Sequence, residues 1–151
     1  MLFVGGGAAA IAGAAALLLW PGGERPVELR PDDPAVVARG QQVYAAHCAS
    51  CHGARLEGQP DWRERGPDGR LPAPPHDPSG HTWHHPDEAL FRITRDGIAE
   101  VAGLPDYATA MPVYRGVLSD ADIVAVLSFI KAQWPADIRA RQDQFNRKAG
   151  G

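Results

Sequence analysis

The pentapeptide Cys48-Ala49-Ser50-Cys51-His52 carries the strongest signal in this chain. Two cysteines separated by two residues and followed directly by a histidine form the attachment signature of a c-type haem. The histidine then serves as an axial ligand of the iron. A disulfide, a redox dithiol and half of a zinc site are the other interpretations. Zinc would need more ligands than these residues supply, and a redox dithiol would accompany a βαβ pattern that is missing here. We therefore predict one haem c, bound covalently through Cys48 and Cys51.

Composition limits the rest of the chain to one modest domain. Hydrophobic residues make up 44% of the 151 residues, while 14 prolines and 17 glycines predict much irregular structure. The net charge is −3 with no long run of one sign, so nucleic acid is not an expected partner. Because haem c is attached outside the cytoplasm, we expect the folded domain on the far side of a membrane.

Residues 2–20 contain no charged side chain and end at Trp20. At about 1.5 Å per residue this stretch would span roughly 28 Å, close to the thickness of a bilayer core. A cleavable signal peptide is the alternative, but no basic region precedes the stretch and no small-residue cleavage site follows it. We predict a single transmembrane anchor in contact with lipid, although the basic residues that follow it argue for the opposite topology. Small residues at four-residue spacing would allow another helix to pack on this anchor.

Four segments follow from these patterns. They are a transmembrane anchor (1–20), a linker containing three prolines (21–32), a haem domain (33–134) and a polar C-terminal helix or tail (135–151). Within the domain, Asp33 and Pro34 are typical of a helix start, and the apolar spacing after them predicts a helix leading into the haem motif. A second helix is predicted between Pro86 and Gly97, and a buried helix after Ser119. Residues 53–85 show no periodicity, so a loop is predicted there.

Gly40 lies inside the first predicted helix, where glycine is about 1 kcal/mol less favourable than alanine. A close crossing by another helix would explain it. Phe129 of the buried helix is the candidate to cross at Gly40 and Tyr44.

Two further residues are candidates for the haem site. Met111 is the only methionine besides Met1, and it lies in a predicted loop just before Pro112. A lone methionine is ordinarily a filler of the core, but a haem with one ligand missing favours thioether coordination, which raises the reduction potential. Pro74, in the rigid run Pro72-Ala73-Pro74-Pro75, can offer a carbonyl to the Nδ1 proton of His52 and so fix the orientation of the ring.

Four histidines form a local group around Trp83: His76, His81, His84 and His85. A second metal site, such as copper, and a protonation-sensitive docking edge are two interpretations of this group. The simpler interpretation, which we favour, is that these are surface histidines at the end of a loop, some of them in contact with the haem propionates, because no carboxylate or thiol completes a recognisable ligand set.

On these residues, the chain resembles the class I (mitochondrial-type) c-type cytochromes in a membrane-anchored bacterial form. The resemblance covers about residues 33–134 and rests on the haem motif, Gly40 with Tyr44, Met111-Pro112 and Phe129. It implies a small all-α fold with crossed terminal helices around one haem. It also implies that His52 and Met111 are the axial ligands and that Pro74 or Pro75 accepts the hydrogen bond from His52. The long histidine-bearing loop and the polar tail depart from the short members of that family.

The expected function is single-electron transfer between respiratory or photosynthetic membrane complexes, such as a quinol-oxidising complex and a terminal oxidase. The protein would act as a tethered shuttle or as a fixed subunit of one complex, in a bacterial cytoplasmic membrane with the haem domain on the periplasmic side. Two filled axial positions exclude a small-molecule substrate from the iron, so no enzymatic activity of its own is expected. A haem-based ligand sensor or peroxidase-like protein with a displaceable sixth ligand, and a copper-handling protein, are the alternatives.

Overall fold

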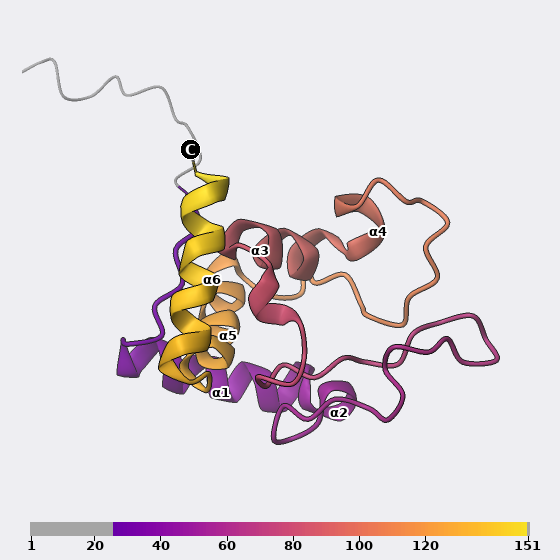
Figure 1. The fold of residues 1–151 in the computed structure, drawn as a ribbon, viewed down its shortest axis with the longest axis horizontal. Coiled ribbons are helices and arrows are strands. Elements are labelled where there is room, and N and C mark those ends of the chain that lie inside the picture. The colour runs from indigo at the N-terminus through magenta and orange to yellow at the C-terminus, as the bar shows by residue number, and fades with distance from the viewer. Residues whose placement is uncertain (1–25, 151) are drawn as a thin grey trace, which may run out of the picture.

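The computed structural model describes residues 26–150, which fold into a helical domain (Figure 1). In this part of the chain the only pairing of β type is an isolated bridge between Arg115 and Leu118. The prediction of an all-α domain is confirmed for these residues. The elements are α1 (Pro34–His47), α2 (Ala49–His52), the 3-10 turn η1 (Thr82–His84), α3 (Asp87–Asp96), α4 (Ile98–Val101), α5 (Asp120–Ala132) and α6 (Ala136–Ala149).

The helix ends follow the capping residues that the sequence predicts. The Asp33 carboxylate accepts hydrogen bonds from the backbone N–H groups of Ala35 and Val36, so it caps α1. The Ser119 hydroxyl accepts from the N–H of Asp122 and caps α5 in the same way. Gly97 ends α3 with φ +90°, a conformation that glycine adopts without strain. The short helix α4 directly after it was not predicted.

Helices α1 and α5 cross at Gly40, as predicted. A Cβ atom at Gly40 would collide with the backbone carbonyl of Ala125 and come within 2.7 Å of the Cβ of Phe129. The rings of Tyr44 and Phe129 pack beside this contact, with centroids 5.5 Å apart. The glycine therefore allows the two helix backbones to touch, and this crossing positions the end of α1 where the haem motif begins.

The hydrophobic core lies between α1, α3 and α5 and extends to the irregular chain on both sides. Its buried members come from α1, α3, α5 and the irregular chain around them: Leu29, Val43, Tyr44, Leu56, Leu90, Phe91, Ile123, Val126, Leu127, Ile130 and Trp134. Leu29 belongs to the segment predicted as a linker, yet its side chain is only 5% exposed. The last residues of that segment are thus packed against the domain.

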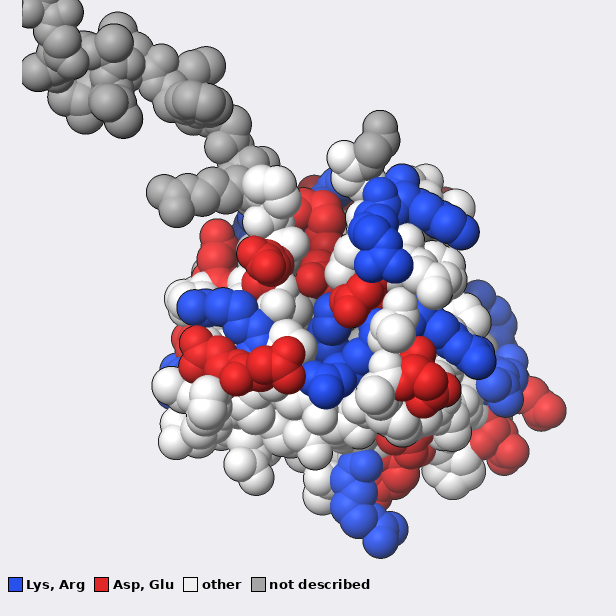
Figure 2. All heavy atoms as spheres, turned by 60° about the vertical axis from the view of Figure 1, so that its left-hand side comes forward, with Lys and Arg blue, Asp and Glu red and all other residues white. Residues whose placement is uncertain are grey.

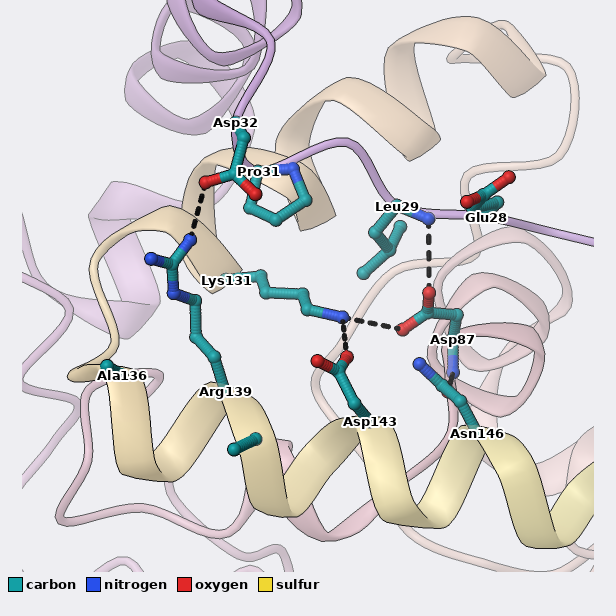
Figure 3. Close-up of a pocket in the computed structure, with 11 residues that line it drawn as sticks. Glu28, Leu29, Pro31, Asp32, Asp87, Lys131, Ala136, Arg139, Asp143 and Asn146 are labelled. Carbon is teal, nitrogen blue, oxygen red and sulfur yellow. Dashed lines mark hydrogen bonds and ion pairs between the residues drawn. The ribbon is translucent and has the colours of Figure 1, made fainter.

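Helix α6 and residues 26–32 are joined to the domain by a cluster of polar side chains (Figure 3). We call this cluster the clasp; its central residues are Asp87, Lys131, Gln142, Asp143 and Asn146. The Lys131 ammonium lies 2.7 Å from Asp143 and 3.8 Å from Asp87, which also accepts from the Gln142 amide at 2.6 Å. The backbone N–H of Asp87 donates to the Asn146 side chain at 2.7 Å. These contacts place α6 against the start of α3 and the end of α5.

The N-terminal segment enters the clasp through its backbone. The N–H of Leu29 donates to the Asp87 carboxylate at 3.1 Å, and the N–H of Arg30 donates to the Ser128 hydroxyl at 2.9 Å. At the rim, Arg139 pairs with Asp32 at 2.8 Å. The space-filling view shows acidic and basic side chains interleaved over this side of the molecule (Figure 2). Residues 26–32 are therefore held along the domain surface.

None of the helices in residues 26–150 has the length and apolar character needed to cross a bilayer. The predicted anchor at 2–20 and the first part of the linker lie outside the described residues.

Candidate haem-binding site

The haem motif folds as a single helical turn directly after α1. Cys48 ends α1, and the next four residues form α2, which includes Cys51 and His52. Both thiols are free: Cys48 is half-buried and Cys51 is exposed. Burial, together with the nearby Cys51 thiol, raises the pKa of Cys48 to about 11. The structure therefore contains two unpaired thiols on adjacent turns, and the disulfide interpretation of the motif is not supported.

His52 is fixed by a backbone carbonyl from the loop opposite. Its ring is 8% exposed, and its Nδ1 lies 2.8 Å from the carbonyl oxygen of Pro74. Burial lowers the pKa of His52, which favours the neutral ring. A neutral ring that donates its Nδ1 proton to Pro74 has its lone pair on Nε2, where a metal would bind. The contact between His52 and Pro74 is thus present, with Pro74 rather than Pro75 as the acceptor.

The start of the loop that carries Pro74 is held at the motif by hydrogen bonds to backbone carbonyls. The N–H of Gly58 donates to the His52 carbonyl at 2.8 Å, and the Tyr44 hydroxyl donates to the Gly53 carbonyl at 2.8 Å. Gly58 has φ +69°, and a Cβ there would collide with the backbone nitrogen of Pro75. The chain around Gly58 and the chain around Pro75 can therefore approach closely only with a glycine at position 58.

Met111 lies in the irregular chain between α4 and α5, as predicted, and is half-buried. Its N–H donates to the Thr109 hydroxyl at 3.1 Å. Three residues later, the Tyr114 hydroxyl donates to the carbonyl of His47 at 2.7 Å. This bond joins the segment that carries Met111 to the residue just before the haem motif. The role of Met111 as an iron ligand stays a prediction.

The same segment is also attached to the end of α3. The N–H of Arg115 donates to the Arg95 carbonyl at 2.8 Å, and its guanidinium lies 2.8 Å from the Asp96 carboxylate. Arg95 contacts the same carboxylate at 2.8 Å. The hydrogen bond from Arg95, and then the charges of both arginines, hold the pKa of Asp96 below its usual range. Asp96 is therefore ionised, and its carboxylate holds the segment that carries Met111 through Arg115.

The histidine group is divided in the structure. His81 stacks on Trp62 with centroids 5.4 Å apart, and His84 lies against Trp83 at 3.7 Å. Residues 26–150 contain no group of three or more histidine, cysteine or carboxylate side chains placed to hold a metal ion. The copper interpretation therefore has no structural support in this part of the chain.

His76 is the one member of the group that lies at the haem motif. Its ring stacks on the ring of His52, with centroids 4.0 Å apart and planes 21° from parallel. From the sequence, His76 was assigned only to the group of histidines around Trp83. Its position two residues after Pro74 was the available signal, because a residue so close to the carbonyl acceptor must lie near the ring that the carbonyl binds.

The donor set fits a c-type haem. Two free thiols lie within one turn of a largely buried imidazole whose Nδ1 is already occupied, so its Nε2 can bind iron. Cys48 and Cys51 would hold the porphyrin, and His52 would be the ligand on one side of the iron.

The helical fold, the crossing at Gly40 and the arrangement of the motif define a domain of the class I c-type cytochrome type. A comparison with protein families supports this assignment: the family described as cytochrome c oxidase, cbb3-type, subunit III matches residues 35–130. The chain belongs to this family. It is thereby a haem-binding electron-transfer cytochrome, and the family implies covalently bound haem c. No solved structure matches the chain significantly. The predicted resemblance is confirmed, whereas α6 and residues 26–34 lie outside the matched range.

Proposed function

We propose that the chain is a membrane-anchored monohaem cytochrome that carries single electrons to or from a terminal oxidase. One haem c would be bound through Cys48 and Cys51, with His52 and Met111 as axial ligands. When bound, the haem would take up and release one electron at its iron. The contact between His52 Nδ1 and the Pro74 carbonyl carries this proposal, because it leaves Nε2 as the only nitrogen of the ring available to a metal.

Met111 is the best candidate for the sixth ligand. The segment that carries it is attached at Tyr114 to the carbonyl of His47, next to the motif, and at Arg115 to Asp96. A segment fixed at both contacts would keep the thioether close to the haem in both oxidation states. With a histidine and a methionine on the iron, no position remains for a substrate, so electron transfer is favoured over catalysis.

A fixed position within a larger complex is favoured over free shuttling. The family name refers to a subunit of a terminal oxidase, which makes such a complex the first partner to test. Residues 27–32 are bound along the domain through Leu29, Arg30 and Asp32, so this part of the predicted linker adds little reach to a tether. A quinol-oxidising complex remains the proposed donor.

Residues 2–20 would anchor the protein in the bacterial cytoplasmic membrane with the haem domain on the periplasmic side. This proposal rests on the uncharged sequence of the segment and on the site of haem attachment. The chain should sediment with membranes after washing with high salt. A variant in which a cleavable secretion signal replaces residues 2–20 should be soluble and still contain haem; if it stays with the membranes, the anchor lies elsewhere.

Absorption spectroscopy of the purified full chain tests the ligand set. The ferric protein should show the weak red band of thioether-to-iron charge transfer, and the reduced protein should not bind carbon monoxide. Met111→Ala should lose the band and bind carbon monoxide rapidly. Val117→Ala is the matched control, because it changes an exposed apolar residue on the same segment.

The opposite result would favour the alternative function. If the wild-type protein binds carbon monoxide as quickly as Met111→Ala and lacks the red band, Met111 is not a ligand. The haem would then have an open position, as in a ligand sensor or a peroxidase-like protein.

A further inference from the structure

Three hydrogen bonds fix His76 in its loop, two at its backbone and one at its side chain. Its N–H donates to the Leu56 carbonyl at 2.8 Å, and its own carbonyl accepts from the Trp134 indole at 2.8 Å. Its Nδ1 lies 2.8 Å from the hydroxyl of Thr82. Leu56, Thr82 and Trp134 are themselves buried, so the ring of His76 is fixed at the backbone and at the side chain.

The fixed ring lies flat against His52. The two centroids are 4.0 Å apart and the planes differ by 21°, which is close to parallel stacking. Tyr44 lies edge-on to the same ring of His76 at 6.4 Å, so His76 fills the space between His52 and the core. Water is thereby kept from one face of the His52 ring.

This stacking supplies a restraint that the hydrogen bond to Pro74 cannot supply. A single hydrogen bond at Nδ1 fixes the tautomer, but it tolerates a range of angles, so the ring can still rock about its Cβ–Cγ bond. A flat neighbour at van der Waals distance blocks that rotation. The two contacts together define the plane of the imidazole and the direction of Nε2.

We propose that His76 is a positioning residue for the proximal ligand: it fixes the plane of the His52 ring, excludes water from it and thereby raises the reduction potential of the bound haem. The proposal rests on the proposed role of His52 as an iron ligand. Its physical basis is that water near the site would stabilise the more highly charged ferric state, and that the orientation of an axial ligand affects the electronic structure of the iron.

Four variants of the full, haem-loaded chain test the proposal. His76→Ala removes the stacked ring, His76→Phe keeps a flat ring without the bond to Thr82, and Thr82→Val removes only the hydroxyl. His81→Ala is the matched control, because His81 also stacks on an aromatic ring but does so on Trp62 at an exposed position. The reduction potential is measured by redox titration, and the haem methyl shifts of the ferric protein by NMR.

His76→Ala should make the equilibrium constant for reduction of the haem about tenfold less favourable. For a one-electron couple this lowers the reduction potential by about 59 mV. Its pattern of haem methyl shifts should change, because that pattern reports the plane of the axial imidazole. His76→Phe should restore the wild-type pattern and most of the potential, and Thr82→Val should have a smaller effect than His76→Ala. His81→Ala should differ from wild type by less than twofold in the same equilibrium.

A His76→Ala protein with the wild-type potential and wild-type methyl shifts would overturn the proposal. The same holds if His76→Phe behaves like His76→Ala while both fold, since a flat ring would then have no effect. If the wild-type protein shows no histidine-ligated haem, the proposed function fails and this proposal fails with it. If the haem is ligated by histidine but is high-spin, the proposed function fails while the variants still test His76. Both outcomes are visible before any variant is made, so the two failures are distinguishable.

Discussion

The haem-binding site and the clasp are held together by different kinds of contact. In the site, side chains bond to backbone carbonyls: His52 to Pro74, Tyr44 to Gly53, and Tyr114 to His47. In the clasp, side chains bond mainly to other side chains, as Lys131 does to Asp143. A carbonyl is present whatever residue carries it, so the geometry of the site depends on the course of the backbone. The geometry of the clasp depends on the identity of each partner.

The two regions also differ in charge. Burial lowers the pKa of both His52 and His76, which favours uncharged rings at the site. The clasp instead encloses the ammonium of Lys131 between two carboxylates, one of them buried. Removal of one member of a buried ion pair leaves an uncompensated charge. Single substitutions should therefore weaken the clasp through charge, and the site through changes in backbone packing.

The largest effect is expected where the backbone supports the site. Gly40→Ala places a methyl group against the Ala125 carbonyl, so α1 and α5 must separate. We expect a loss of about 3 kcal/mol in the free energy of unfolding, near the upper end for an overpacked core. Guanidinium unfolding followed by haem absorbance measures it. Gln41→Ala, at the exposed neighbouring position of α1, is the control. Equal stability of the two variants would show that the crossing is not a tight contact.

The same contrast explains what the sequence could predict. Gly40 and Phe129 were identifiable because a glycine in a helix is unfavourable unless another backbone approaches it. Asp33 and Ser119 were identifiable because capping depends on local hydrogen bonds. The haem motif was identifiable because its chemistry requires its spacing. Each of these features has its physical cause within a few residues of chain or in one predictable contact.

The clasp and His76 have no such local cause. Gln142 is fully buried, yet it lies in a helix whose polar composition predicts exposure. It is buried because Asp87, 55 residues earlier, provides an acceptor for its amide. His76 lies in a loop without periodicity, so its stacking on His52 depends on the whole course of residues 53–76. Contacts between polar groups far apart in the sequence leave no periodic pattern from which they could be predicted.

A smaller but still substantial effect is expected when the clasp loses its cation. Lys131→Met should reduce the free energy of unfolding by about 2 kcal/mol, because Asp87 and Asp143 then lie close together without the ammonium. Residues 26–32 should become more sensitive to proteolysis, since Asp87 also holds the N–H of Leu29. The visible spectrum and the reduction potential should stay as in wild type.

Lys148→Met is the control for this variant, because it removes an exposed lysine near the end of α6. If Lys131→Met shifts the reduction potential, the clasp and the haem-binding site are coupled and are not independent regions of the molecule.

Asp96 tests a charged contact on the haem side, where it pairs with both Arg95 and Arg115. Because the pKa of Asp96 is lower in the folded chain than its usual value of about 3.9, its stabilising effect is fully present above that value. The effect is lost as the pH falls through the lowered pKa. Asp96→Asn should reduce stability at pH 7 by about 1 kcal/mol and should flatten the acid limb of the stability profile.

The measurement is the free energy of unfolding between pH 3 and pH 7, with the red charge-transfer band recorded in parallel. The band should weaken at a higher pH in Asp96→Asn, because Arg115 no longer anchors the Met111 segment to a carboxylate. Asp106→Asn, an exposed change in the same segment, should reproduce the wild-type profile. A profile for Asp96→Asn that parallels the wild type would mean that this carboxylate has no part in the acid response.

The smallest effect is expected at the rim of the clasp. Arg139 pairs with Asp32 at 2.8 Å, but the Asp32 side chain is 85% exposed, so water and salt screen the pair. Arg139→Ala should change the free energy of unfolding by about 0.3 kcal/mol, and this small change should vanish in high salt. Comparison of Arg139→Ala with Lys131→Met separates the stability contributed by the buried part of the clasp from that contributed by its exposed edge. A loss as large as that of Lys131→Met would mean that α6 is held by its rim, and that burial of Lys131 and Gln142 is a consequence of docking rather than its cause.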